Sequence, residues 1–524
     1  MRAHHLDDPE VDVFYEATLG PLHDQAAAAI EEAMPLVPRL WERDHTLWDD
    51  DPTEISDRLG WLDAVERADQ LLAELGRLST GVVADGITDV LLVGMGGSSL
   101  YPEVLARCLG PAAGAPRLTV LDSTDPAAVL AAERSLPWST TLVVPASKSG
   151  TTIEMACLLE RYWQRLVEAH GDDAGRFVLP ITDPGSALDA RAREQGWRGV
   201  VHGQPAVGGR FSALTPFGLV PAALLGLDLT AHLAPARELL EASRWTHPRE
   251  NTPATLGAIM AAAVRAGRDK LTLLLPEAIE SFGAWIEQLV AESTGKHGLG
   301  IVPVLGETPQ TATFGADRLV VAFGDHPALG EVPDGVPTVA LDPSGPDRLA
   351  AEVVRFEVAT AIAGALLGIN PFDQPNVAAA KEATARVLER GEDLPAPTSA
   401  APLLETVSAG DVVALLGFVA PGSADEDILH AAAARLRRDL GVPVTVGIGP
   451  RYLHSTGQLH KGGSSRLVAL LTVGEDPTDA AIPGRDYTFS RLKRAQAAGD
   501  LHALEAAGRR VGLVELAELR SIAG

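Results

Sequence analysis

Four hydroxyl side chains and a lysine are concentrated in one short turn, ASKSGTT, at residues 146–152. The turn follows an apolar run and precedes a helical pattern. Hydroxyl and backbone N–H groups at a helix N-terminus donate hydrogen bonds to an anion, and a phosphate suits this position. The candidate donors are Ser147, Ser149, Thr151 and Thr152, with Lys148 among them.

A helix cap is the simpler interpretation of the same turn. One Ser or Thr is enough for an N-cap, and Glu154 could complete a capping box with Thr151. A cap does not require four hydroxyls and one of only six lysines in the chain. The turn therefore predicts a phosphate site rather than a cap alone.

A glycine-rich turn, GMGGSSL at residues 94–100, has the same strand–turn–helix arrangement. Its glycines let the backbone approach a ligand, and Ser98 and Ser99 could cap the helix that follows. It lacks the last glycine of the dinucleotide fingerprint and the Gly-Lys pair of a P-loop. By itself, this turn is compatible both with an anion site and with a plain turn at a sheet edge.

The segment SFGAWIEQLVAESTGK predicts an amphipathic helix that carries a candidate catalytic group. Its apolar residues recur at helical spacing and face a core: Phe282, Trp285, Ile286, Leu289 and Val290. Gln288 and Glu292 are four residues apart on a different face, so both can point into one site. Glu292, near the helix end, is a candidate general base, and an ordinary exposed glutamate is the alternative.

A second helical segment, INPFDQPNVAAAKEATARVLER, carries another candidate group. Asp373 is predicted to be its N-cap, and Pro375 lies near its first turn. Lys381 lies on a mostly apolar face, where a lysine either extends to solvent or is held in a site. A buried ammonium near a bound anion explains this position better.

The elements that must position these residues alternate between apolar strands and helices. Strand-like runs occur at residues 87–94, 117–122, 140–147, 176–182, 270–276, 318–323 and 336–342, with helical patterns between them. This alternation predicts an α/β fold of doubly wound parallel sheets. The predicted parts are an N-terminal helical segment without strands (1–80), a first α/β domain (81–245), a second one (246–395) and a C-terminal α/β extension (403–524).

Composition limits the kinds of partner. The 524-residue chain has a net charge of −27 and 46% hydrophobic residues, which indicates a soluble globular protein that repels nucleic acid and anionic membranes. No apolar run approaches the roughly 18 residues of a membrane-spanning helix, and no signal peptide is recognised. A cytoplasmic location is expected, with Cys108 and Cys157 as free thiols.

Together the motifs resemble the glucose-6-phosphate isomerase (phosphoglucose isomerase) family, which is built from two sugar-isomerase (SIS) domains. The matching stretches occur in the family's order: GMGGSSL, SKSGTT, GGRFSALTPFGLVPAAL, WIEQLVAESTGKHGLGI and NPFDQPNVAAAK. The tail, beginning GPRYLHSTGQLHKGG, resembles the subclass in which the isomerase follows a transaldolase domain. This chain has no room for both enzymes, so the isomerase alone is expected.

The resemblance implies a role for each matching residue. Glu292 would move a proton between C1 and C2, Arg210 would stabilise the enediolate, and Lys381 would assist at the ring oxygen. The residues implied to bind the substrate or its phosphate are Gly97, Ser98, Ser147, Lys148, Ser149, Thr152, Gln288 and Gln374.

The ring-opening histidine departs from the family pattern. Many relatives carry it in a stretch like L-H-S-x-G-Q between the glutamate helix and the lysine helix, whereas here LHSTGQ lies at residues 453–458. We predict that His454 is the ring-opening acid, with His297 as the alternative. A zinc site formed by His454 and His460 lacks further ligands at suitable spacing, so no metal is expected.

The resemblance implies interconversion of glucose 6-phosphate and fructose 6-phosphate through a cis-enediol(ate), with no cofactor. It also implies a homodimer in which residues cross the interface. The alternatives are a dual glucose/mannose 6-phosphate isomerase and a non-catalytic SIS module that binds sugar phosphates.

Overall fold

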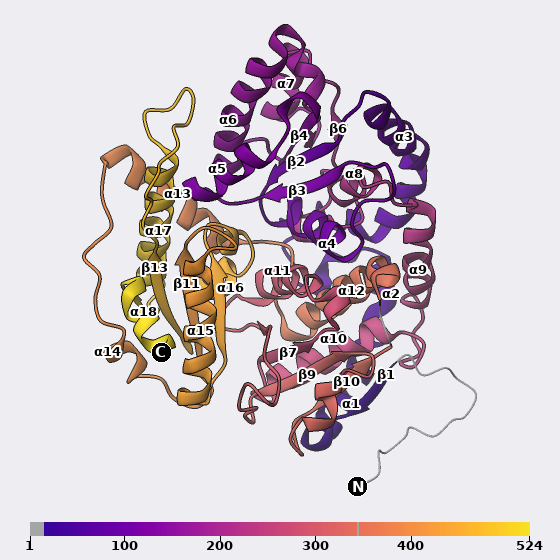
Figure 1. The fold of residues 1–524 in the computed structure, drawn as a ribbon. Coiled ribbons are helices and arrows are strands. Elements are labelled where there is room, and N and C mark those ends of the chain that lie inside the picture. Colours follow the sequence, from indigo (N-terminus) through magenta and orange to yellow (C-terminus); the bar gives the residue numbers. More distant parts are fainter. Residues whose placement is uncertain (1–14, 343–344) are drawn as a thin grey trace.

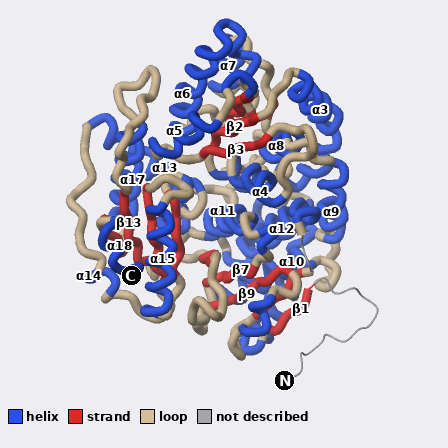
Figure 2. The backbone as a smooth tube through the Cα atoms, in the orientation of Figure 1, coloured by secondary structure: helices blue, strands red, loops and turns tan. Residues whose placement is uncertain are grey.

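A computed structural model describes residues 15–342 and 345–524, which form three sheets flanked by helices (Figures 1 and 2). The first sheet has the strand order β3-β2-β4-β5-β6, and all its pairs are parallel. Its strands are β2 (Asp89–Gly94), β3 (Arg117–Leu121), β4 (Thr141–Ala146), β5 (Ile181–Thr182) and β6 (Val201–His202). Strand β5 is shorter than the predicted run 176–182 because the 3-10 helix η6 (Gly171–Phe177) occupies the start of that run.

Helices cover both faces of this first sheet. In β2, Val90 and Leu92 pack into one apolar cluster, whereas Leu91 and Val93 pack into another on the opposite face. Both clusters are buried, which explains why the strand is continuously apolar rather than alternating. The helices around the sheet are α3 (Ala64–Ala84), α4 (Leu100–Cys108), α5 (Pro126–Ser135), α6 (Ile153–His170), α7 (Ala187–Glu194) and α8 (Pro216–Leu224).

The second sheet has the order β1-β10-β9-β7-β8 and corrects one prediction. Its strands are β1 (Tyr15–Thr18), β7 (Lys270–Leu274), β8 (Val302–Val304), β9 (Arg318–Phe323) and β10 (Thr338–Leu341). The N-terminal segment was expected to lack strands, but β1 pairs antiparallel with the edge strand β10. The remaining pairs in this sheet are parallel, as expected.

The rest of the N-terminal segment is helical, as predicted for its described part. It contains α1 (His23–Ala33), α2 (Leu36–Trp41) and most of α3.

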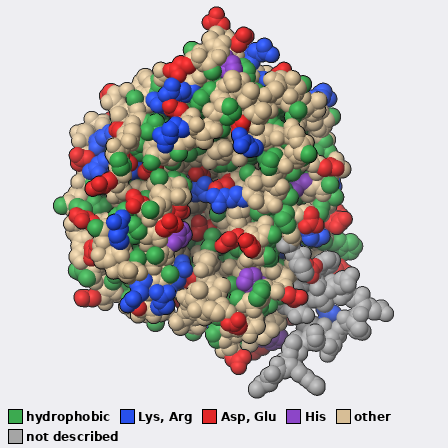
Figure 3. All heavy atoms as spheres, viewed as in Figure 1, with side chains coloured by type: hydrophobic (Ala, Val, Ile, Leu, Met, Phe, Trp, Pro, Cys, Tyr) green, Lys and Arg blue, Asp and Glu red, His purple; other side chains and the backbone are tan. Residues whose placement is uncertain are grey.

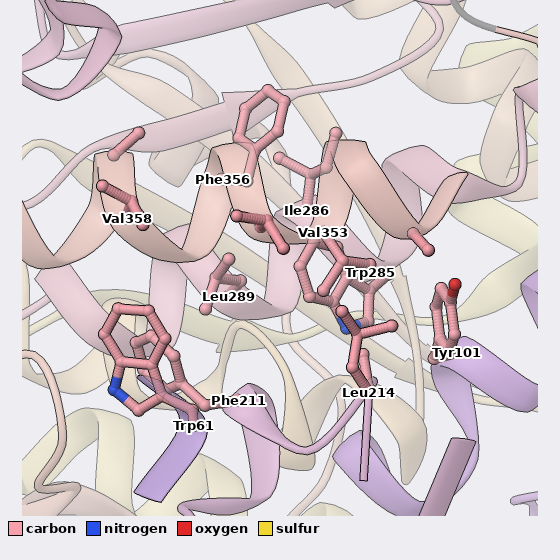
Figure 4. Close-up of a cluster of buried hydrophobic side chains, with 14 of the residues drawn as sticks. Trp61, Tyr101, Phe211, Leu214, Trp285, Ile286, Leu289, Val353, Phe356 and Val358 are labelled. Atoms are coloured by element: carbon pink, nitrogen blue, oxygen red, sulfur yellow. The ribbon is translucent and has the colours of Figure 1, made fainter. Parts of the chain in front are cut away.

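The second α/β unit consists of the second sheet and its helices. These helices are α9 (Leu229–Ala242), α10 (Thr252–Arg265), α11 (Phe282–Thr294), α12 (Leu349–Leu367) and α13 (Pro375–Arg390). Helix α11 packs its predicted apolar face into the core: Trp285, Ile286 and Leu289 lie beside Val353 and Phe356 of α12 (Figure 4).

The C-terminal unit, residues 403–524, forms a third parallel sheet in the order β12-β11-β13-β14. Its elements are β11 (Val412–Phe418), β12 (Val444–Ile448), β13 (Leu467–Val473), β14 (Arg510–Leu513), α15 (Ala424–Leu440), α16 (Gly457–Gly462), α17 (Phe489–Ala506) and α18 (Leu516–Ala523). Apolar residues on one face of this sheet share a cluster with Ala291, Val302 and Val304 of the second unit. The C-terminal unit is therefore packed against the second α/β unit through a common core.

The predicted α/β class with parallel sheets is confirmed. Within the described residues, no helix is both long and apolar enough to span a bilayer. Acidic and basic side chains are interspersed over the surface shown in Figure 3.

Candidate active site

Glu292 is buried at the end of α11, beside the two side chains that the sequence placed with it. It is 5% exposed, and its Oε1 lies 3.3 Å from Nη1 of Arg210. Gln288 is one turn earlier on the helix and donates from Nε2 to Glu292 Oε2 at 3.3 Å. The i, i+4 spacing therefore brings both side chains into one site, as predicted.

Arg210 is held in a single orientation by its remaining nitrogens. It lies in the 3-10 helix η7 (Gly209–Phe211) and is 4% exposed. Its Nε donates to Ser293 Oγ at 2.9 Å, and Nη2 donates to the carbonyl oxygens of Pro371 and Asp373, both at 2.7 Å. Because these bonds fix the planar guanidinium, Nη1 stays directed at Glu292.

His454 reaches the same site from the C-terminal unit. It ends the 3-10 helix η11 (Arg451–His454), and its Nε2 lies 2.9 Å from Glu154 Oε1. Its carbonyl oxygen accepts a 2.8 Å hydrogen bond from Gln288 Nε2. The histidine is therefore connected to the Glu292 helix through its backbone and to helix α6 of the first unit through its ring.

Glu154 has a different role from the one its sequence position indicated. It is 3% exposed, and its carboxylate binds His454 instead of completing a capping box. Burial alone would raise the pKa of this carboxyl, but the charge and hydrogen bond of His454, helped by Lys381, lower the pKa below its usual value. An ionised partner of this kind orients an imidazole and stabilises its protonated form.

The glycine turn brings the backbone of the first unit close to these groups. Gly96 has φ +56°, and a Cβ there would lie 2.7 Å from both Gln288 Nε2 and the His454 carbonyl oxygen. A Cβ at Gly97 would lie 1.9 Å from the Gly209 carbonyl oxygen. The turn therefore packs tightly against the elements that carry Arg210, Gln288 and His454. Ser98, predicted to bind phosphate, is the last residue of the 3-10 helix η4 in this turn.

The hydroxyl turn ends at Thr152, two residues before Glu154 on helix α6. Ser147 Oγ and Thr152 Oγ1 are 3.0 Å apart, and Ser149 Oγ and Thr151 Oγ1 are 2.8 Å apart. Thr152 is the N-cap of α6, but its side chain accepts no capping hydrogen bond from the helix. The cap interpretation is therefore not supported, and a helix N-terminus without a side-chain cap is a suitable place for an anion.

The Lys148 side chain is used differently from the expectation. Its Nζ lies 2.8 Å from Asp183 Oδ2 and donates to the Gln204 carbonyl oxygen at 3.1 Å. Burial lowers the pKa of Lys148, against the opposing effect of Asp183. The ammonium is thus already paired, and the Lys148 carbonyl oxygen accepts from Asp183 N–H and Thr182 Oγ1. The backbone N–H of Lys148 is the group left for the role assigned to this residue.

The two predicted residues of the α13 region are at the solvent-exposed side. Lys381 is exposed, so the prediction of a buried ammonium at this position is wrong; its charge acts on Glu154 from the solvent-exposed side. Gln374 is also exposed and is the N-cap of α13, a position that the sequence assigned to Asp373. Asp373 instead forms an ion pair with Lys296, which explains why it does not cap the helix.

Lys296 is a site residue that the sequence analysis did not assign. Its Nζ lies 2.6 Å from Asp373 Oδ1, and the side chain is 1% exposed. Burial and the nearby charge of Arg210 lower the pKa of Lys296 to about 7, against the effects of Asp373 and Glu292. Its place in the glycine-rich stretch ESTGKHGLG was the only available signal.

The alternative histidines are not at this centre. His297 is exposed and has φ +55°. His460 is buried, and burial lowers its pKa to about 3, so it is neutral. Among the residues that the structure describes, no cluster of three or more His, Cys, Asp or Glu side chains could hold a metal ion.

Comparisons with known proteins identify relatives of this chain. A sequence model described as phosphoglucose isomerase matches residues 66–304. Glucose-6-phosphate isomerase of Rubrobacter xylanophilus is 31% identical over 411 residues, which cover 67% of this chain and 93% of the relative. The enzyme of the same name from Synechococcus sp. (strain CC9605) is 32% identical over 376 residues, 62% of this chain and 70% of the relative.

Solved structures show the same fold. A hypothetical protein from Thermus thermophilus is 26% identical with a TM-score of 0.59, covering 71% of this chain and 99% of that one. A glucose-6-phosphate isomerase from Chlamydia trachomatis, 18% identical, has a TM-score of 0.60 and covers 73% of this chain and 89% of its own. Sequence and fold lead to one conclusion: the chain belongs to the phosphoglucose isomerase family.

Proposed function

We propose that this protein is an aldose–ketose isomerase that interconverts glucose 6-phosphate and fructose 6-phosphate. The observation that carries the proposal is the buried Glu292 carboxylate, 3.3 Å from a guanidinium that every other contact fixes in place. A base beside a fixed positive charge is the arrangement that abstraction of a weakly acidic carbon proton requires.

Ring opening is assigned to His454. The protonated imidazole donates its proton to the ring oxygen as the bond from that oxygen to C1 breaks, and the C1 hydroxyl releases its proton to solvent to leave an aldehyde. Glu154 stabilises the imidazolium before the transfer. Lys381, exposed at the edge of the site, assists at the same oxygen.

Isomerisation is assigned to Glu292 and Arg210. Glu292 removes the proton from C2 of the open aldose and returns it to C1, while a hydroxyl proton moves from O2 to O1. Arg210 stabilises the negative charge on the enediolate between the two transfers. The electrons stay within the substrate, so the reaction balances without an external oxidant or reductant.

Phosphate binding is assigned to the hydroxyl turn and to the start of α6. This turn is connected to Glu292 by a short chain of contacts through Glu154, His454 and Gln288. Binding the phosphate away from the reacting carbons orients C1 and C2 at the base.

The Glu292→Gln variant tests the proposal. It should bind substrate with unchanged affinity and lose about 10²–10⁴-fold in kcat, because the amide cannot accept the carbon proton. Glu287→Gln on the same helix is the matched control and should keep wild-type turnover. Burial raises the pKa of Glu287 to about 7, so near neutral pH the neutral amide replaces a carboxyl group that is already partly protonated. Near-normal kcat in Glu292→Gln would overturn the assignment, and turnover of mannose 6-phosphate would indicate the dual isomerase.

Assembly and location are part of the same proposal. We infer a homodimer from the family resemblance and a cytoplasmic location from the free thiols of Cys108 and Cys157. His454 reaches Glu154 of its own chain, which differs from the expectation that residues cross the dimer interface. Light scattering with parallel activity assays during dilution tests this point: specific activity should stay unchanged on dissociation into monomers if one chain holds the whole site, whereas activity lost in step with dissociation would show that a partner completes it.

A further inference from the structure

We propose that Gln496, on the C-terminal helix α17, is a positioning residue that holds the Glu154–His454 pair in the geometry needed for ring opening. This inference rests on the proposed isomerase function. It assigns a role in that reaction to a residue more than 100 positions beyond the last SIS-domain motif.

The contacts of Gln496 are those of an orienting amide. The residue is 1% exposed, and its Nε2 donates to Glu154 Oε1 at 2.7 Å. This is the same carboxylate oxygen that lies 2.9 Å from His454 Nε2. On its other side, Gln496 Oε1 accepts a 2.6 Å hydrogen bond from Thr124 Oγ1. Both ends of the amide are thus occupied, so the carboxylate can rotate only by breaking this chain.

One loop of the first unit fixes the position of α17 and η11. Asp122 binds Arg451, three residues before His454, at 2.9 Å. Thr124 binds Gln496, and Asp125 accepts a 2.9 Å hydrogen bond from Lys493, one turn before Gln496 on α17. These polar side chains of a single loop hold residues from two separate elements of the C-terminal unit. The histidine and the amide are therefore set against Glu154 by one common support.

The amide is also the chemically suitable group at this point. Glu154 faces the imidazole of His454, the ammonium of Lys381 and the thiol of Cys157. Another carboxylate at 496 would repel Glu154, whereas an apolar side chain would remove a donor from a buried anion. The Gln496 amide is a neutral donor, so it favours the ionised form of Glu154. It does not compete for the proton that His454 carries.

The test compares Gln496→Leu with wild type and with Asp411→Asn, all as full-length protein. Asp411 binds Arg510 at the other end of the C-terminal sheet, so its variant controls for a general loss of stability. In Gln496→Leu, kcat for glucose 6-phosphate should fall by about 10–100-fold. The acid limb of kcat/KM should move up by about one pH unit, because Glu154 loses a donor to its charged form. KM should stay within about twofold of wild type, since the hydroxyl turn is intact.

A double-variant cycle separates this role from simple packing. If Gln496 acts through Glu154, adding Gln496→Leu to Glu154→Gln should change kcat no further, whereas independent effects would multiply. Should Gln496→Leu not fold, Thr124→Val removes only the bond that orients the amide and should shift the acid limb in the same direction by less. If the wild type is active and the Gln496→Leu variant keeps the wild-type kcat and pH profile, the role of Gln496 is overturned but the proposed function is not. A wild type without turnover would overturn the proposed function and this inference with it.

Discussion

Lys296 is a second buried positive charge near Glu292, in addition to Arg210. It is almost completely buried, between the carboxylate of Asp373 and the guanidinium of Arg210. Burial penalises the ammonium, and the one close carboxylate compensates only in part. The residue therefore carries a pH dependence that an exposed lysine would not.

The sign of that dependence follows from proton binding. The pKa of Lys296 is about 7 in the folded chain and about 10.4 for an ordinary lysine in the unfolded chain. Between these values the unfolded state holds more protons, so the free energy of unfolding should rise by up to roughly 1.4 kcal/mol per pH unit.

Urea unfolding of wild type and Lys296→Met at pH 7, 8 and 9 measures this effect. The difference between the two proteins should grow with pH in favour of wild type. A difference that is constant across this range would show that Lys296 keeps its proton.

At the scale of elements, the site depends on close contact between the glycine turn and η7. The backbone at Gly97 leaves no room for a side chain, since an added Cβ would lie 1.9 Å from the Gly209 carbonyl oxygen. Arg210 is the next residue along, and its guanidinium must lie within a few tenths of an ångström of its position to stay fixed by Ser293 and Pro371.

Gly97→Ala should therefore reduce kcat by at least about 100-fold, because displacement of η7 moves Arg210 away from Glu292. Steady-state kinetics and thermal unfolding would measure the two consequences. Gly76→Ala is the matched control: Gly76 lies within α3 with nothing within 4 Å of an added Cβ. That variant should be more stable by about 1 kcal/mol with unchanged kinetics.

At the scale of the whole molecule, activity depends on how the C-terminal unit is attached to the first unit. Lys493 is completely buried and lies between Asp125 of the first unit and Asp476 of the C-terminal unit. When one member of a buried group of ion pairs is removed, the charges of its partners stay buried and uncompensated. This lysine therefore links the attachment of the unit to the position of His454 and Gln496.

Lys493→Met should lower the free energy of unfolding by about 3–5 kcal/mol and reduce kcat, because two carboxylates lose their shared cation. Arg494→Met, one residue along the same helix, removes a half-exposed charge 3.5 Å from Asp393 and should cost less than about 1 kcal/mol. Denaturant unfolding with parallel activity measurements distinguishes them. Equal stability of the two variants would show that the lysine does not secure the unit.

Local patterns in the sequence determined much of this protein. The strand β9 has the predicted bounds, residues 318–323, and α11 buries the predicted stripe and points Gln288 and Glu292 into one site. These features depend on periodicity and on turn chemistry within a few residues, so they are visible without knowledge of the rest of the chain.

Only the tertiary structure decided which distant groups meet. Glu154 binds His454, 300 residues away in sequence; the Lys148 ammonium binds Asp183 instead of facing the hydroxyl turn; and β1 joins the edge of the second sheet. A buried polar group must find a partner, but its own neighbourhood in the sequence does not specify which one. The chemistry of each residue was therefore readable in advance, whereas its partner was set by how the three sheets pack together.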